Sequence, residues 1–306
     1  MKAIEEARAF YEERGREMLR REFGPYENKI AVGLAGHGSE CFGFDDDISR
    51  DHDYEAGFCL WIDSETDREI GFELSRAYKA LRKDRPQSRS VYGRSPVGVW
   101  RIEDFYMRYT GSPGAPESWQ QWMYLPGHAL AEATNGQVWR DDAGIFSAVR
   151  EKILHGMPED VRRKKIAAAA VTMAQSGQYN YSRCLKHGEE GAAMLALGEF
   201  VNAAGSMVFH LNRRHMPYYK WMLRAMKELP VLSEMAAALE FLLCGENDPA
   251  GRETKRQVVE DICSCIIKEL KKQGLSCGSW DYLEPHAHDI MSHIENPQIR
   301  AMHIME

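Results

Sequence analysis

Residues 33–63 of this 306-residue chain read GLAGHGSECFGFDDDISRDHDYEAGFCLWID, and this stretch decides the fold. It begins within a short apolar run, KIAVGLAG (29–36), which predicts a buried strand. A turn-rich segment with glycines and acids follows it. The apolar and aromatic run YEAGFCLWID (54–63) then predicts a second strand. Two short strands therefore enclose a polar turn.

A helical pattern precedes the first strand. Residues 3–22 are amphipathic and are followed by Gly24 and Pro25, which end a helix. The expected buried face of this helix consists of Ile4, Ala7, Phe10, Tyr11, Met18 and Leu19.

After the second strand, residues 64–83 predict another helix, with an N-cap at Ser64 or Thr66. A loop is expected over Pro86–Pro96, and residues 97–111 are expected to form a third strand that runs into a helix. This order of elements favours a small mixed sheet with helices packed on it.

The second half of the chain differs in composition. From about residue 146 onward, Ala, Met and Leu recur at helical spacing, which predicts a helical bundle. We therefore expect an α+β protein with a mixed-sheet domain over 1–145 and a C-terminal helical domain over 146–306.

Charge and composition exclude some classes of function. The net charge of −7 and the pI near 5.9 argue against a protein whose main function is to bind the phosphate backbone of nucleic acids. We expect no membrane segment, because no run approaches the ~18 apolar residues that a span needs. The charged N-terminus lacks the apolar centre of a signal peptide. Seven scattered cysteines, an odd number, are typical of reduced thiols, so we expect a cytoplasmic protein.

Two aspartates are the candidate metal ligands in this sequence. Asp51 and Asp53 are two residues apart at the start of the second expected strand, so their side chains are expected on one face. Paired carboxylates bind Mg²⁺, which leaves coordination sites for water and substrate phosphates. Gly38 allows a close backbone approach, and Ser39 offers a hydroxyl and an N–H to phosphate oxygens. Neither a P-loop nor a dinucleotide-binding motif is present.

Gly38-Ser39, followed after eleven residues by Asp51-His52-Asp53, resembles the signature of the DNA polymerase beta-like nucleotidyltransferase superfamily. The longer text GSECFGFDDDISRDHD resembles a bacterial nucleotidyltransferase-like family of unknown function, as do TNGQVWRDDAGIFSAVR, MPEDVRRKKIA, QSGQYNYSR and LNRRHMPYYKW. The resemblance implies a minimal nucleotidyltransferase sheet followed by a helical domain.

The resemblance also implies further site residues. A third carboxylate would fall near Gly98, which is not an acid; Glu103 is the nearest candidate and Asp104 the next. The helical domain would supply cations to a triphosphate, and we select Lys186 and Lys220 for this role. Tyr179 and Tyr181 would stack on a base or line the acceptor pocket, although packing roles remain open for both.

Other polar clusters have simpler interpretations. Asp45–Asp47 are expected to be a solvated loop, and Arg162–Lys165 a solvated helix face. Cys263 and Cys265 diverge on a helix, and the histidines of HAHDIMSH (286–293) lack a paired cysteine motif, so we expect no zinc site.

The sequence thus predicts a nucleotidyltransferase that uses Mg²⁺, or Mn²⁺ in its place. It would move a nucleoside monophosphate from an NTP to a small-molecule or protein acceptor and release pyrophosphate. Two alternatives stay open: a catalytically inactive nucleotide-binding or interaction protein on the same fold, and an RNA-modifying transferase.

Overall fold

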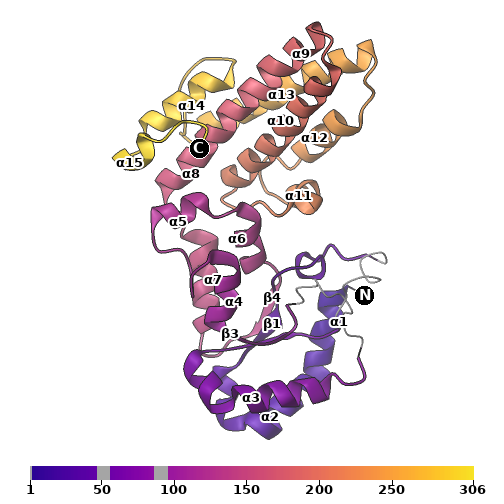
Figure 1. Ribbon diagram of the computed structural model, residues 1–306, viewed down its shortest axis with the longest axis vertical. Helices are drawn as coiled ribbons and strands as arrows, with labels where there is room; N and C mark the ends of the chain where they lie inside the picture. Colours follow the sequence, from indigo (N-terminus) through magenta and orange to yellow (C-terminus); the bar gives the residue numbers. More distant parts are fainter. Residues whose placement is uncertain (1, 47–55, 86–95) are drawn as a thin grey trace. The chain divides into compact units, whose positions relative to one another are not determined.

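The computed structural model describes residues 2–46, 56–85 and 96–306 (Figure 1). It divides into two compact units, Met1–Gly156 and Met157–Glu306. The first unit contains helices and a small mixed sheet, and the described chain of the second unit is helical. The predicted α+β class is confirmed at this level.

Four short strands form the sheet of the first unit: β1 (Ala31–Leu34), β2 (Cys59–Ile62), β3 (Gly98–Arg101) and β4 (Gln137–Arg140). Their order is β3-β2-β1-β4. β1 is antiparallel to β2 and to β4, whereas β2 is parallel to β3. Three strands were expected from the sequence, and β4 was missed. Its signal is the Asn135-Gly136 turn directly before the short segment Gln137–Arg140, whose two central residues are Val and Trp.

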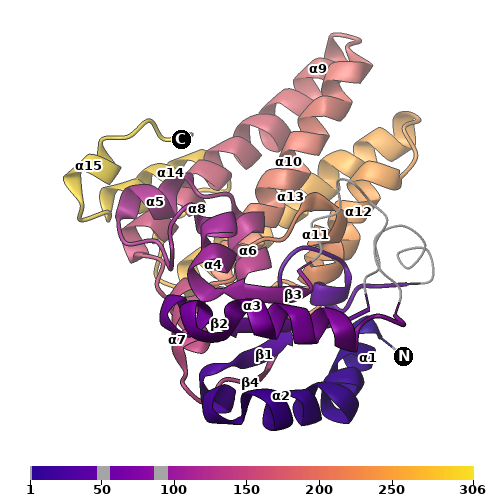
Figure 2. The ribbon, with the colours of Figure 1, turned by 60° about the horizontal axis from the view of Figure 1, so that its bottom comes forward.

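One face of the sheet is covered by the N-terminal helices α1 (Ala3–Phe10) and α2 (Arg16–Phe23), joined by the π-helical turn η1 (Tyr11–Gly15), and by α3 (Ser64–Leu81) (Figure 2). All six residues of the predicted helix face are buried. Phe10, Tyr11, Met18 and Leu19 among them belong to one core cluster with Phe58, Leu60 and other apolar side chains of this layer. Gly15 is needed here, because a Cβ on it would lie 2.6 Å from the ring of Phe58. The N-cap of α3 is Asp63, whose carboxylate accepts from Thr66 N–H at 2.7 Å, so the expected cap at Ser64 or Thr66 is wrong.

The opposite face carries α4 (Ile102–Thr110), α6 (Gly127–Thr134) and α7 (Ile145–His155) (Figures 1 and 2). Trp61 of β2 points into this layer and stacks on Phe146 of α7, with ring centroids 3.9 Å apart. The Tyr106 hydroxyl donates to the Phe146 carbonyl at 3.0 Å. These contacts place α7 in the core of the first unit, so the boundary between the units falls at Gly156 and not at the expected residue 145.

The remaining elements of the first unit are short: η2 (Gly24–Lys29), η3 (Glu40–Phe42) and α5 (Trp119–Tyr124). The second unit contains α8 (Glu159–Met173), η4 (Ala174–Tyr181), α9 (Ser182–Lys186), α10 (Glu190–Leu211), α11 (Tyr219–Met226), α12 (Met235–Cys244), α13 (Pro249–Lys272), α14 (Leu283–Ser292) and α15 (Pro297–Arg300). α8 packs against both α10 and α14, which places it at the centre of this unit.

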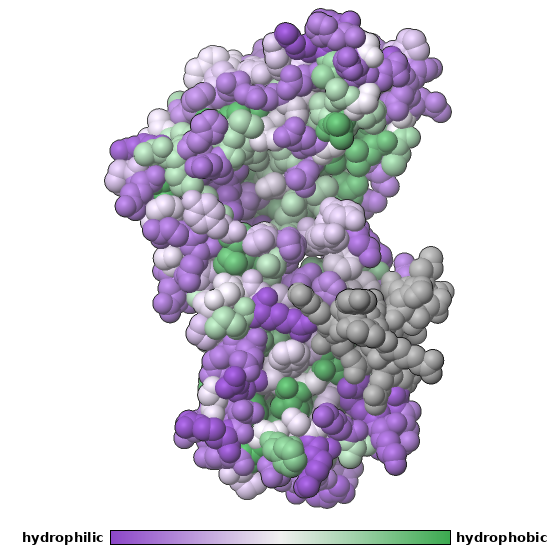
Figure 3. Space-filling model, viewed as in Figure 1, coloured by the Kyte–Doolittle hydropathy of each residue, from purple (hydrophilic) through white to green (hydrophobic). Residues whose placement is uncertain are grey.

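Among the described residues, α10 is one helix that is long and apolar enough to cross a membrane by length and composition. The expectation that no run comes near this length is therefore wrong. Within the second unit, 56% of its most apolar window is buried, and α10 packs on α8 and η4. Figure 3 shows polar side chains over much of the visible surface of this unit. The burial and packing of α10 are those of a core helix.

The basic run at the start of α8 is not a solvated face. Arg162 and Lys164 are buried, with 4% and 0% of their surface exposed. Arg162 pairs with Glu159 at 2.6 Å and donates to the His210 carbonyl at 3.2 Å. Lys164 donates from Nζ to the Ile304 carbonyl at 3.2 Å. The prediction failed because both side chains have partners that lie far away in the sequence.

Candidate functional site

The carboxyl end of β1 and the amino ends of β2, β3 and β4 lie together at one edge of the sheet. Because β1 is antiparallel to β2 and β4, its carboxyl end lies beside their amino ends, as the pairs Gly33–Cys59 and Leu34–Gln137 show. β3 also begins here, because Cys59 pairs with Gly98 in parallel register. We call this the site edge. The loop that leaves β1 and the segments that enter β2, β3 and β4 therefore meet at it.

The loop that leaves β1 makes a tight turn over residues 35–39, here called the glycine turn. Gly36 and Gly38 have φ angles of +119° and +125°, which side-chain-bearing residues rarely adopt. Asn135, which precedes β4, is hydrogen-bonded to both the N–H and the carbonyl of Gly36. Its Oδ1 accepts from Gly36 N–H and its Nδ2 donates to the Gly36 carbonyl, each at 2.7 Å. The backbone of this turn is therefore fixed by a side chain 99 residues away.

Aromatic and backbone contacts complete the support of the glycine turn. The His37 N–H donates to the Tyr109 hydroxyl at 3.1 Å, and Tyr109 itself is buried. A Cβ on Gly36 would lie 2.6 Å from the same hydroxyl. The backbone therefore approaches Tyr109 more closely than any other residue type would allow at this position.

Gly38 and Ser39, the predicted phosphate-binding pair, are both in the glycine turn. A Cβ on Gly38 would come within 2.5 Å of the Glu40 carboxylate. Ser39 precedes η3, and its carbonyl accepts from Phe42 N–H at 3.1 Å and from Phe44 N–H at 2.9 Å. The helix that starts here has only three residues, so its dipole is small. The partly exposed backbone of Gly38 and Ser39, rather than a helix terminus, is what this site offers to a phosphate.

His37 gives the glycine turn a titratable charge. Its Nδ1 lies 3.2 Å from the Glu132 carboxylate of α6. This hydrogen bond raises the pKa of His37 above its usual value of 6.5, against the opposing effect of burial. The imidazolium form is thus favoured beside a turn that is expected to hold phosphates.

The start of β2 is equally well fixed. The Tyr78 hydroxyl accepts from Phe58 N–H at 2.7 Å and donates to the Phe58 carbonyl at 2.5 Å. Arg82 Nε donates to the Ala56 carbonyl at 3.0 Å. The Cys59 thiol donates to the Pro96 carbonyl at 3.1 Å, and burial raises its pKa to about 12, so it is no nucleophile at neutral pH.

The two aspartates of the predicted metal site, Asp51 and Asp53, lie outside the described residues. Within residues 2–46, 56–85 and 96–306, no group of three or more His, Cys, Asp or Glu side chains is placed to hold a metal ion. Ala56, where description resumes, follows Asp53 by three residues in the sequence.

The acid expected at Glu103 lies at the other end of the sheet. Gly98 is at the site edge, but β3 runs away from that edge, and Glu103 follows its last residue. One Glu103 carboxylate oxygen accepts from Ser64 N–H at 3.4 Å, at the start of α3. The next candidate, Asp104, is exposed and pairs with Arg101 at 2.7 Å. This placement supports a capping role for Glu103 and argues against it as a third metal ligand.

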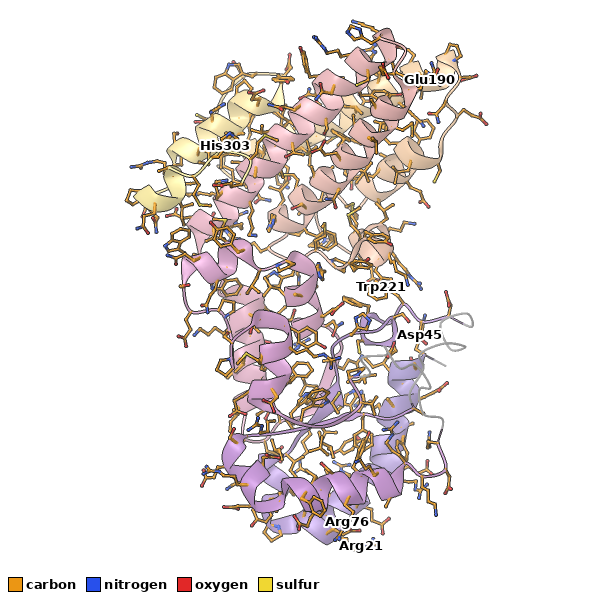
Figure 4. All side chains as sticks on the ribbon, viewed as in Figure 1. Arg21, Asp45, Arg76, Glu190, Trp221 and His303 are labelled. Atoms are coloured by element: carbon orange, nitrogen blue, oxygen red, sulfur yellow. The ribbon has the colours of Figure 1, made fainter. Side chains whose placement is uncertain are left out.

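Asp45, from the acidic run that was expected to be solvated, is buried beside the start of α1 (Figure 4). Its Oδ2 accepts from Ala3 N–H at 2.9 Å, and its carbonyl accepts from Lys2 Nζ at 2.9 Å. A carboxylate at a helix N-terminus is stabilised by the helix dipole. Asp45 therefore attaches the end of the loop from the glycine turn to the N-terminal helix, and the expectation for this residue is wrong.

The predicted residues of the helical unit do not form one cluster. Lys186 ends α9, which packs near the start of α10, whereas Lys220 lies on α11, whose Met222 contacts Gly205. Figures 1 and 4 show α9 and α11 at opposite ends of α10, with Glu190 and Trp221 labelled there. From Glu190 to Gly205 a helix rises by about 22 Å. The two lysines therefore cannot bind one triphosphate together.

The two tyrosines differ in exposure. Tyr179 is 52% exposed, and its hydroxyl accepts from Arg183 Nη1 at 2.8 Å. Tyr181 is 1% exposed, which supports the packing alternative for this side chain. Tyr179 stays a prediction as a stacking surface.

Sequence reasoning missed Asn135, Tyr109 and Glu132. The Asn-Gly pair at 135–136 marks a turn, but nothing in the sequence shows that its amide reaches Gly36. Tyr109 and Glu132 lie on helices where aromatic and acidic residues are common, so no local signal distinguishes them.

A family described as a domain of unknown function (DUF4037) matches residues 122–222. This segment is about a third of the chain and includes Glu132, Asn135 and β4 but not the glycine turn. No curated protein and no solved structure matches the chain.

Proposed function

We propose that this chain is a Mg²⁺-dependent nucleotidyltransferase, with Mn²⁺ able to replace Mg²⁺. The proposal rests on one observation: the glycine turn and the start of β2 meet at the site edge. In the sequence, Asp51-His52-Asp53 ends three residues before Ala56, the first of the anchored residues 56–58 that lead into β2. The topology thus supports a phosphate-binding backbone and a pair of carboxylates acting on one substrate.

The residues at the site edge have the chemistry that this function needs. Positive φ at Gly36 and Gly38 lets the turn pack closely on the Tyr109 hydroxyl and the Glu40 carboxylate, while Gly38 and Ser39 stay partly exposed to phosphate oxygens. Asn135 and Tyr109 accept from the N–H groups of Gly36 and His37 and so hold the turn in place before substrate binds; preorganisation of this kind contributes to catalysis. The hydrogen bond to Glu132 raises the pKa of His37 and so favours a positive charge next to the turn. Asp51 and Asp53 would hold the metal through carboxylate oxygens, the ligands that Mg²⁺ prefers.

The bound metal would neutralise charge on the phosphates as the bond between the α- and β-phosphates breaks. The acceptor hydroxyl attacks the α-phosphate, and pyrophosphate leaves. The acidic composition favours a small-molecule or protein acceptor over nucleic acid, and we place the reaction in the cytoplasm. An RNA acceptor would show itself as RNA binding that falls steeply with salt.

The alternative is a nucleotide-binding protein without transferase activity. Gly98 stands at the site edge where a third carboxylate is expected, and Glu103 lies at the other end of the sheet. Without that acid, no general base has been placed for the attacking hydroxyl. Calorimetry in which NTP binds but no pyrophosphate is released would favour this alternative.

The test incubates the protein with Mg²⁺ and each α-labelled NTP, and measures label transfer together with pyrophosphate release. Asp51→Ala/Asp53→Ala is compared with the wild type and with Glu65→Ala/Asp142→Ala, which removes two exposed acids beyond the opposite ends of β2 and β4. We expect activity in the wild type and in the control variant, and a loss of at least about a hundredfold in the Asp51/Asp53 variant. Equal activity in all three proteins, or none in any, would contradict the proposal.

A further inference from the structure

A pocket in the C-terminal part of the second unit has no role in the proposed transfer reaction. It has a cavity volume of about 530 Å³, which is in the range of small-ligand sites. Trp280, Tyr282, Glu284, His288 and Asp289 line it. The pocket lies outside the segment that matches the family of unknown function. We propose that it binds an organic ammonium cation.

Trp280 is held as one wall of the pocket although its surface is 47% exposed. Its ring lies on Gly278, where a Cβ would come within 1.9 Å of Trp280 Cζ3. The ring of His286 meets it edge-on, with centroids 5.5 Å apart and an interplanar angle of 81°. The Trp280 carbonyl is hydrogen-bonded to His286 Nε2 at 2.9 Å. An exposed indole with this much support is a preformed surface rather than a mobile side chain.

Asp289 is fixed as a second wall. Its Oδ2 accepts from the Ser276 hydroxyl at 2.7 Å and from Cys277 N–H at 2.9 Å. These hydrogen bonds, that of Ser276 first, hold the pKa of Asp289 below its usual value, so the pocket keeps a carboxylate charge at neutral pH. Ser276 is also hydrogen-bonded to Nδ1 of the buried His286 at 2.7 Å. One buried network thus positions both Trp280 and Asp289.

The segment between these walls is attached to the rest of the helical unit. The N–H of Leu283, at the start of α14, donates to Gln178 Oε1 at 3.0 Å, and Gln178 Nε2 donates to Glu260 at 2.8 Å. Leu283 itself is fully buried. α14 packs against α8, so the pocket is built on the core of the unit.

The lining selects the charge of the ligand. Trp280 and Tyr282 contribute aromatic rings to the lining, and the faces of such rings attract cations through the ring quadrupole. Glu284 and Asp289 add carboxylates, which attract a cation and repel phosphates and other anions. An alkylammonium group matches both features, because its methyl or methylene groups pack on the rings while its charge faces the acids. Neutral apolar molecules would pack on the rings but would gain no attraction from the acids.

The test uses isothermal titration calorimetry with the full chain and three probes. Choline is a quaternary ammonium, Nα-acetyl-lysine methylamide carries a primary ammonium, and 3,3-dimethylbutan-1-ol is the neutral counterpart of choline. We expect at least one cation to bind about tenfold or more tighter than the alcohol. The tighter cation shows whether the pocket is built for a small quaternary ammonium or for a lysine side chain.

Two variants locate the binding. Trp280→Leu removes an aromatic face, and Glu284→Gln removes a charge; each should weaken cation binding about tenfold. Asp261→Asn, at an exposed acid of α13, is the control for net charge and should bind like the wild type. Circular dichroism checks that each variant is folded. Equal affinity for choline and the alcohol, no cation binding, or unchanged binding in both pocket variants would overturn the proposal.

Discussion

The support of the glycine turn by Asn135 gives a prediction whose size follows from the structure. In Asn135→Ala, the Gly36 N–H loses its acceptor and the Gly36 carbonyl loses its donor, both at 2.7 Å. Arg150, which donates to the Thr134 carbonyl at 2.6 Å, still holds the backbone next to residue 135. The substitution therefore removes the contact with the turn without releasing the segment before β4.

Two hydrogen bonds contribute about 1 kcal/mol each, and a partly buried group left without a partner costs somewhat more. We expect the free energy of unfolding of the first unit to fall by about 2–3 kcal/mol. For a unit of this size, 1 kcal/mol corresponds to about 2–4 °C in Tm, so the expected decrease is about 4–12 °C. If the glycine turn binds phosphates, NTP turnover should also decrease.

Differential scanning calorimetry and urea unfolding measure this change. Asn135→Asp, which keeps the acceptor for Gly36 N–H, should fall between the wild type and Asn135→Ala. Asn202→Ala, on an exposed position of α10, serves as the control and should change stability by less than about 0.5 kcal/mol. An Asn135→Ala variant as stable as the Asn202→Ala control would refute the argument that this side chain fixes the turn.

Three further predictions concern the turn, its charge and the second unit. Gly38→Ala should lower kcat/KM for the NTP by about tenfold or more, measured as pyrophosphate release, because φ at this position is +125°. The KM for the NTP should rise as the pH increases through the raised pKa of His37, because the imidazolium is lost. In a KM–pH profile, Glu132→Gln should move this rise to lower pH, because it removes the carboxylate that raises the pKa of His37. An unchanged profile would count against a role for His37. Lys164→Ala should destabilise the second unit by about 2–4 kcal/mol in urea unfolding, while Lys268→Ala, at an exposed position, should have little effect.

Local sequence patterns predicted the N-terminal helical segment and the first two strands. The six apolar residues selected over 3–22 are all buried, because burial on an amphipathic helix follows its period of 3.6 residues; buried Ala3 and Gly15 were not selected. The strands around 29–36 and 54–63 were equally clear, as both are apolar runs next to turn residues. β4 was missed because only Val138 and Trp139 of its four residues are apolar, so no continuous apolar run marks it.

Long-range contacts explain the failures. Lys164 and Arg162 look like solvated residues in the sequence, but carbonyls of distant segments and Glu159 satisfy them inside the unit. Glu103 was selected by its distance in sequence from Gly98, whereas the direction of β3 takes it to the far end of the sheet. Asn135 could not be assigned at all, because its partner is 99 residues away.

The central claim is that one substrate bridges the glycine turn and the aspartates that precede β2. A crystal structure with Mn²⁺ and a non-hydrolysable NTP tests it most directly, since anomalous scattering locates the metal. The account predicts an anomalous peak between the carboxylates of Asp51 and Asp53, with the triphosphate against the backbone of Gly36–Ser39. Metal bound by other side chains, or a triphosphate away from this turn, would contradict it.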